Sequence, residues 1–250
     1  MKVIDVDIIG NNLNRNFTFF VPDPDLPPES SLYTRIEKAR KSTVPQDVED
    51  DDELRQLLER LPCCASKEEN LHPAEPMNIV IIGALDDWTT AFIRRGYGYQ
   101  PLSARYAFGR IQDISGRKRS RGYTEAQAHT FRLWLTPIRY KGIPVWVGQT
   151  SLRLGGRFSR KISRKKTLPL DPYVDEARDD LIQDLAYSQA LIKLGHVKGS
   201  GTPGKKGKIE EPADLDYFTD GLRAVLVFGD RPASLETIDF FDWERPSEYR

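Results

Sequence analysis

The order of apolar patterns after Met77 constrains the fold of this chain more than any other feature. Residues 78–82 form a short apolar run bounded by Pro and Gly, which is typical of a buried strand. The next segment places apolar side chains at helical spacing, with Asp86 or Asp87 able to cap its start and Gly96 at its end. A buried strand followed by a helix is therefore predicted.

Two further strands and a second helix are predicted next. Residues 131–136 alternate in character and face residues 144–154 across a turn at 139–142, as in a β-hairpin. Residues 172–194 carry the strongest helix pattern, because Asp171 can cap the start and Gly195 can end it. Spacings of three and four connect Val174, Ala177, Leu181, Leu185, Ser188 and Ile192.

These patterns predict an α+β fold with a mostly antiparallel sheet. With a last buried strand at 224–228, the order is strand, helix, strand, strand, helix, strand, which is that of a split-βαβ, or ferredoxin-like, sheet. Upstream, residues 3–9 and 17–21 predict a β-hairpin, and leucines from Leu54 to Leu61 predict a helix. The expected division is 1–53, an N-terminal hairpin and acidic linker; 54–230, the α+β domain; and 231–250, a C-terminal tail.

Charge is distributed in three blocks that cancel. Residues 94–166, the basic belt, contain eighteen Lys/Arg and two acids. Residues 1–93 contain nine Lys/Arg and eighteen acids, and residues 167–250 contain ten and seventeen, so the net charges are −9, +16 and −7. Such polarisation indicates an anionic partner, which can be a phosphate-bearing ligand, a membrane surface or the acidic segments of the chain itself.

Composition argues against several classes of protein. No window approaches the ~18 apolar residues of a transmembrane helix, and the start lacks a signal-peptide pattern, so we expect a cytoplasmic protein, peripheral to a membrane at most. Cys63 and Cys64 are neighbours, with Cα atoms ~3.8 Å apart, below the usual disulfide range of ~4.4–6.8 Å. A partly buried thiol pair is expected there. Two Cys and three His predict no structural metal site, and no cofactor is expected.

Candidate ligand-binding residues lie in and after a Gly- and Ser-containing segment, residues 108–121. Its backbone amides and arginines suit phosphate or carboxylate, with Gln112 and Asp113 orienting the ligand. The arginines concerned are Arg110, Arg117, Arg119 and Arg132. The alternative is an exposed basic loop balanced by water and the acidic flanks. A second basic run, 157–166, could follow a nucleic-acid backbone, but it holds one aromatic residue, so nucleic acid is the weaker hypothesis.

A hydrolase is the alternative function. Asp171, Asp175 and Arg178 lie within two turns at a helix start, where they could orient a water, or could serve only as cap, dipole partner and ion pair. His129 is a candidate general base, and Asp220 completes the catalytic candidates. This interpretation requires Asp113, His129, Asp171 and Asp220 to converge in one pocket.

Residues 199–205 imitate a phosphate-binding loop. Lys206 occupies the place of the Ser/Thr that would meet Mg²⁺, and neither a preceding strand nor a following helix is expected. We therefore expect residues 195–208 to be a flexible connector, and not a nucleotide site.

The chain resembles the LssY C-terminal domain family. The resemblance rests on ordered segments within 54–230, namely LPCC (61–64), MNIVIIG (77–83), PLS (101–103) with FGRIQD (108–113), FRLW (131–134), PVWVG (144–148), DP (171–172) with Asp175 and Arg178-Asp179, and YFTDG (217–221). It implies no established activity. It does imply proximity to membranes, because members often accompany membrane-embedded modules, including lipid-phosphatase-like and DedA-like ones.

Typical members of that family carry histidines just before the Asp-Pro, where this chain has TLPL (167–170). The resemblance therefore argues against a metalloenzyme. The sequence favours an accessory or binding domain that recognises an anionic ligand through its basic belt, ahead of the hydrolase and the nucleic-acid binder.

Overall fold

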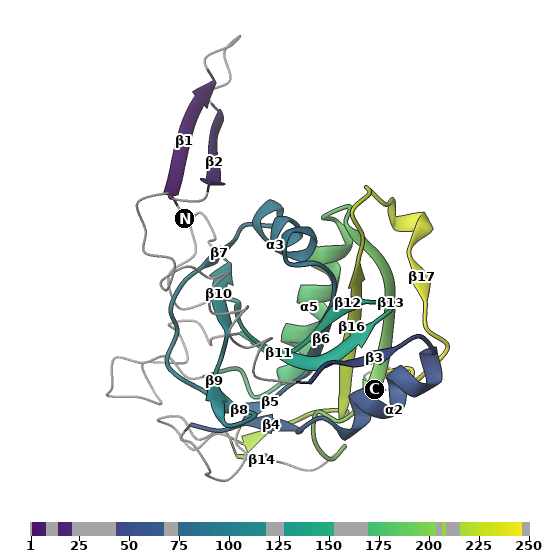
Figure 1. The fold of residues 1–250 in the computed structure, drawn as a ribbon. Helices are drawn as coiled ribbons and strands as arrows, with labels where there is room; N and C mark the ends of the chain where they lie inside the picture. The colour runs from purple at the N-terminus through teal and green to yellow at the C-terminus, as the bar shows by residue number, and fades with distance from the viewer. Residues whose placement is uncertain are drawn as a thin grey trace, which may run out of the picture. The chain divides into compact units, whose positions relative to one another are not determined.

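The computed structural model describes residues 2–8, 15–21, 44–67, 75–118, 128–152, 170–203, 207–208 and 216–246 (Figure 1). The chain divides into two compact units, Met1–Val44 and Pro45–Arg250. In the first unit, β1 (Lys2–Ile8) and β2 (Arg15–Val21) pair antiparallel, as the predicted N-terminal hairpin requires.

A nine-stranded mixed sheet organises the second unit (Figure 1). Its order is β17-β13-β16-β6-β12-β11-β10-β7, and β3 also pairs with β11. The strands are β3 (Gln46–Val48), β6 (Ile79–Ile82), β7 (Tyr97–Tyr99), β10 (Ile114–Lys118), β11 (Thr130–Tyr140), β12 (Ile143–Ser151), β13 (Leu191–Lys198), β16 (Leu222–Phe228) and β17 (Asp239–Phe240). Short pairs join β4 (Cys64–Ala65) to β5 (Glu75–Pro76), β8 (Tyr106–Ala107) to β9 (Arg110–Ile111) and β14 (Gly207–Lys208) to β15 (Asp216–Tyr217).

The α+β class and the mostly antiparallel sheet are confirmed, but the split-βαβ order is not. A helical crossover from β12 should lead to a strand parallel to it, and that strand is β13, which the sequence analysis missed. The chain then turns back into β16, which is antiparallel to β13 and parallel to β6. Because the unpredicted strand β13 precedes β16, β16 runs parallel to β6, whereas the ferredoxin-like order requires it to be antiparallel.

The prediction of a helix over 172–194 is correct only for its first half, α5 (Val174–Ala186). Gln189 has φ 63, and the chain continues into β13, so Ile192 and Gly195 lie in a strand, as do residues 195–198 of the expected connector. The predicted cap is also wrong, because the Asp171 carboxylate accepts from the Tyr173 amide and the helix has no side-chain cap. Apolar residues continue at spacings of three and four beyond the end of α5, so this part of the sequence was predicted as helix and β13 was missed.

Three helices cover the sheet in the described part of the chain. From α2 (Asp51–Arg60), Leu54 and Leu58 join the apolar cluster that contains Val147 of β12. The neighbouring residue, Trp146, points to the opposite face, where its ring packs 5.5 Å from that of Trp88 in α3 (Leu85–Arg94). Helix α5 lies beside the end of α3, where Arg95 is 3.5 Å from Asp184 of α5. None of these helices has the length and apolar character needed to cross a bilayer.

Several local predictions require correction. Residues 46–53, expected to belong to an acidic linker, contain β3 and the start of α2, whose cap is Asp50. Helix α3 begins after Ala84, and Asp86 and Asp87 occupy its first turn instead of capping it. The hairpin turn is confirmed and is two residues long, because Lys141 and Gly142 have φ of 51 and 76, as a type I′ turn requires.

The prediction of a thiol pair is also wrong, because Cys63 and Cys64 form a disulfide across a Cα separation of 3.7 Å. The Cα criterion assumed the usual disulfide geometry, whereas adjacent residues can bond through a small ring that includes their own peptide.

Candidate functional site

Much of the described part of the basic belt is paired with acids from outside the belt. Arg105 lies 2.6 Å from Glu75, and Lys118 lies 2.5 Å from Asp184. The weaker pairs are Arg95 with Asp184, Arg132 with Glu75 and Lys141 with Asp51, at 3.5, 3.8 and 3.8 Å. Both acidic blocks thus supply partners to the belt, as the internal-pairing alternative expects.

Glu75 is the centre of a buried charge network that the sequence analysis missed. Its side chain is 1% exposed, and those of Arg105 and Arg132 are 3% and 5% exposed. Arg105 donates to Oε1 through Nε and Nη2, at 2.9 and 2.6 Å, and Gln149 donates to Oε2. Burial acts to raise the pKa of Glu75, but the two arginines outweigh it and hold that pKa below its ordinary value.

The predicted ligand-binding residues in the described ranges contact other parts of the chain. Arg110 donates to both Asp113 carboxylate oxygens and to the Leu135 carbonyl, and Asp113 accepts from the Leu135 amide at 2.7 Å. The Gln112 side chain accepts from the Arg105 amide and donates to the Ser103 carbonyl. These residues brace the segment before β10 against β11.

The three other candidate arginines lie in different places. Arg132, on β11, donates to Ser103 and Gln149 within the Glu75 network. Arg117 lies on β10, opposite Thr130 of β11, and is half-buried. Arg119 and the second basic run, 157–166, lie outside the described residues.

His129, the candidate base, lies in a relay of hydrogen bonds between β11 and α5. The Tyr97 hydroxyl lies 3.0 Å from His129 Nδ1 and donates to Asp184, while His129 Nε2 lies 2.7 Å from the Thr150 hydroxyl. Burial lowers the pKa of His129 to about 4, so the imidazole is neutral at pH 7. Burial and Asp184 raise the pKa of Tyr97 above its ordinary value.

Asp175 and Asp220 converge on Arg178, whose side chain is completely buried. Arg178 donates to both oxygens of Asp220, at 2.8 and 3.1 Å, and Nε donates to Asp179. Asp175 accepts from the Thr219 hydroxyl and the Asp220 amide. Burial raises the pKa of Asp175 to about 6, although Arg178 acts in the opposite direction.

Within the described residues, no hydrogen bond or ion pair joins Asp113, His129, Asp171 and Asp220, the set that the hydrolase requires, to one another. Asp113 contacts Arg110, His129 contacts Tyr97 and Thr150, Asp171 contacts a backbone amide, and Asp220 contacts Arg178. Among the contacts of the described residues, Asp175 and Asp220 are the only catalytic candidates that share a partner, which is Arg178. Their contacts hold α5 to the start of β16. In the ranges that the structure covers, no three His, Cys, Asp or Glu side chains gather as a metal site would need.

Residues 199–205, which resemble a phosphate-binding loop in sequence, follow a strand as such a loop does. They still have Lys206 in place of the Ser/Thr, and no helix begins at residues 207–208. The strand β13 does precede them, contrary to expectation. Gly199 and Gly201 have φ of 135 and 124, and the Ser200 hydroxyl donates to the Leu222 carbonyl. Residues 207–208 form β14, so no helix begins there.

One end of the sheet brings together the places where two basic segments leave it. Arg117 pairs with Thr130, and Thr130 pairs with Ser151, so the end of β10, the start of β11 and the end of β12 are adjacent. Residues 119–127 follow β10, and residues 153–169 follow β12. The Asp171 amide donates to the Leu152 carbonyl at 2.9 Å, which closes the base of the second segment.

Comparison with protein families assigns the domain. A family model described as LssY C-terminus matches residues 89–222. The chain belongs to the LssY C-terminus family. The match runs from α3 to the first residue of β16, so it includes His129 and Arg178, whereas Glu75 and the disulfide precede it. No curated protein and no solved structure matches the chain.

Proposed function

We propose that this LssY C-terminus domain is a binding domain for a phosphate-bearing anion, which it recognises through two basic segments, residues 117–121 and 153–166. The observation that carries the proposal is the sheet register, in which Thr130 of β11 pairs with Arg117 of β10 on one side and with Ser151 of β12 on the other. The two basic segments, which are distant in the sequence, therefore follow strands that end side by side in the sheet.

The charge balance of the belt supports the same segments. Arg110 and Arg132, first considered as ligand-binding residues, have acidic partners within the fold. Residues 153–166 contain seven Lys/Arg and no acid, and 117–121 contain four Lys/Arg and no acid, although one of these four, Lys118, pairs with Asp184. Phosphate groups attract such clusters by Coulomb interaction and charge-assisted hydrogen bonds.

The phosphate can belong to a lipid headgroup or to a free phosphorylated metabolite. In the lipid case, residues 54–230 would act as an accessory domain at the cytoplasmic surface of a membrane. Each basic residue near an anionic surface contributes about 1 kcal/mol, so several acting together are sufficient for peripheral binding.

A charge-neutralising variant tests the proposal. The full chain carrying R160Q, K161Q, K165Q and K166Q is compared with the wild type for binding to vesicles of phosphatidylserine and phosphatidylcholine, and to inorganic phosphate. The matched control removes four exposed charges elsewhere, through R60Q, K67Q, R231Q and R245Q. We expect at least tenfold weaker binding for the first variant and little change for the control. Equal binding by both variants would contradict the proposal, and the two ligands distinguish the lipid from the free anion.

A further inference from the structure

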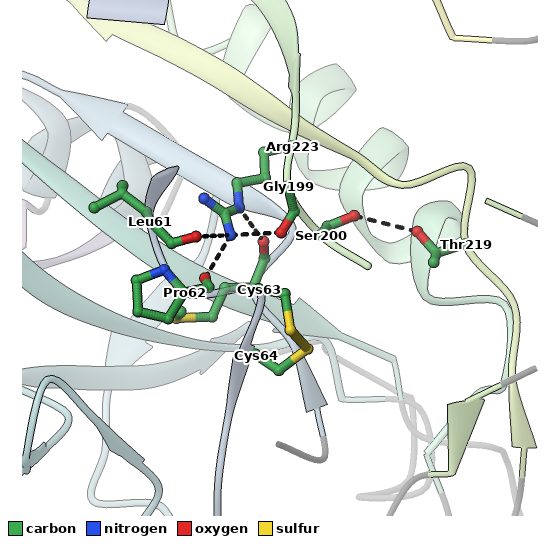
Figure 2. Close-up of a disulfide and its surroundings, with 9 residues drawn as sticks. Leu61, Pro62, Cys63, Cys64, Gly199, Ser200, Thr219 and Arg223 are labelled. Atoms are coloured by element: carbon green, nitrogen blue, oxygen red, sulfur yellow. Dashed lines mark hydrogen bonds between the residues drawn. A yellow bond between two sulfur atoms is a disulfide. The ribbon is translucent and has the colours of Figure 1, made fainter. Parts of the chain in front are cut away.

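The disulfide between Cys63 and Cys64 (Figure 2) follows α2, Cys64 is the first residue of β4, and both cysteines are partly exposed. A disulfide that reagents can reach is open to attack by an external thiolate, whereas a fully buried one is protected. Accessibility is the first requirement for reversible chemistry at this pair.

The backbone around the pair is fixed by contacts that do not involve sulfur. The Met77 amide donates to the Cys63 carbonyl at 2.8 Å, and Cys64 pairs with Pro76 between β4 and β5. On the preceding side, Arg223 Nη2 donates to the Leu61 and Pro62 carbonyls. Opening the disulfide therefore leaves the two thiols side by side, so the bond can form again.

Arg223 supplies a positive charge next to this segment. Its side chain on β16 is fully buried, and every acceptor of its guanidinium in the described part of the chain is a backbone carbonyl. Figure 2 shows it between the Leu61–Pro62 segment and Gly199. Burial lowers its pKa to about 10, which still leaves it protonated at pH 7. None of its hydrogen-bond partners in the described ranges is a carboxylate.

We propose that Cys63–Cys64 is a reversible dithiol–disulfide site and that Arg223 stabilises its thiolate. A positive charge close to a cysteine lowers its pKa, and the thiolate is both the attacking and the leaving group in exchange. The partner is a small dithiol or a dithiol protein. This function is separate from anion binding by the basic segments.

The exchange proceeds in two balanced steps. A thiolate of the partner dithiol attacks one sulfur of the pair, forms a mixed disulfide and releases the other cysteine as a thiolate. The second thiol of the partner, once deprotonated, then attacks the partner's first sulfur in the mixed disulfide. This step releases the second cysteine of the pair as a thiolate. Two electrons and two protons pass to Cys63 and Cys64, and the partner becomes a disulfide.

Intact-mass analysis of the native full chain after iodoacetamide labelling tests reversibility. We expect no label before reduction, two labels after dithiothreitol without denaturant, and none again after oxidised glutathione. The variants C63S and C64S, which cannot close the ring, should take one label without prior reduction. Two labels in the untreated and the reoxidised wild type would overturn the proposal, as would labelling that requires denaturant.

The pH dependence of the alkylation rate tests the role of Arg223. In the reduced wild type, the more reactive thiol should have a pKa below the ~8.5 of free cysteine, and R223Q should raise it. If R223Q does not fold, a peptide of residues 61–65 (LPCCA) is the reference instead. A wild-type pKa equal to that of the peptide would overturn the electrostatic role.

Discussion

Replacing Glu75 by Gln tests whether the charges of Arg105 and Arg132 serve the fold. Glu75 accepts two hydrogen bonds from Arg105 and one from Gln149, and it is the acidic partner of Arg132. The side chains of all three charged residues are at most 5% exposed. The substitution keeps the shape of the side chain but removes the carboxylate that faces both buried guanidinium groups.

The expected cost follows from this burial. Removing one partner of a buried ion pair destabilises a protein by about 3–5 kcal/mol, because the remaining charge is desolvated and uncompensated. The Gln side chain keeps one acceptor, so we expect the lower end, about 3 kcal/mol. Against a typical unfolding free energy of ~5–15 kcal/mol, that is a large fraction.

Urea unfolding followed by far-ultraviolet circular dichroism measures the effect, with Glu59→Gln as the matched control. Glu59 pairs with Arg55 at 3.1 Å, but both side chains are about 30% exposed, at 32% and 30%, so its loss should cost about 0.3–0.5 kcal/mol. Equal midpoints for the two variants would refute the inference that the Glu75 network holds these arginines in place.

Three further outcomes are expected. Leu181→Ala, on the buried face of α5, should lower the unfolding free energy by ~2–5 kcal/mol, and an unchanged thermal midpoint would be inconsistent with its burial. The pKa of Asp175 is about 6 in the folded protein, against an ordinary value of 3.8. Protonation of Asp175 therefore stabilises the folded state below pH 4, and this contribution is lost as the pH rises above 6. The wild type should therefore lose about 2 kcal/mol relative to Asp175→Asn as pH rises from 4 to 7, measured by urea unfolding; a constant difference contradicts this. Lys205→Ala and Lys206→Ala should leave ligand binding intact, and a loss of ATP binding would show that residues 199–205 are a true phosphate loop.

The parts of the fold with strong local patterns were predictable. The run 78–82 became β6, and the alternating residues 131–136 became part of β11, because local propensity and final environment agree there. Strand β10 was missed because its sequence, ISGRK, is polar, and it pairs through backbone contacts. A Cβ on Gly116 would lie 2.4 Å from the Gly98 carbonyl oxygen, so the close approach of β7 depends on that glycine.

The site was less predictable, because its partners are defined by the sheet register and not by spacing along the chain. Glu75 is thirty positions from Arg105, and only the fold shows that they meet. The one available signal was an acid three residues before a buried apolar run, where burial of a carboxylate requires a cation nearby. His129 and Asp175 were noticed as titratable residues, but their separate partners could not be foreseen.

Sedimentation of the wild-type chain with phosphatidylserine-containing vesicles at low and high salt tests the central claim most directly. If the basic segments recognise phosphate, the chain should bind at 50 mM salt and bind much more weakly at 300 mM, because salt screens charges beyond about 8–10 Å near physiological ionic strength. The same salt increase should change the unfolding free energy little. Absence of binding to both vesicles and inorganic phosphate at low salt, with a fold that salt destabilises, would contradict the claim and show that the belt serves only to pair with the acidic blocks.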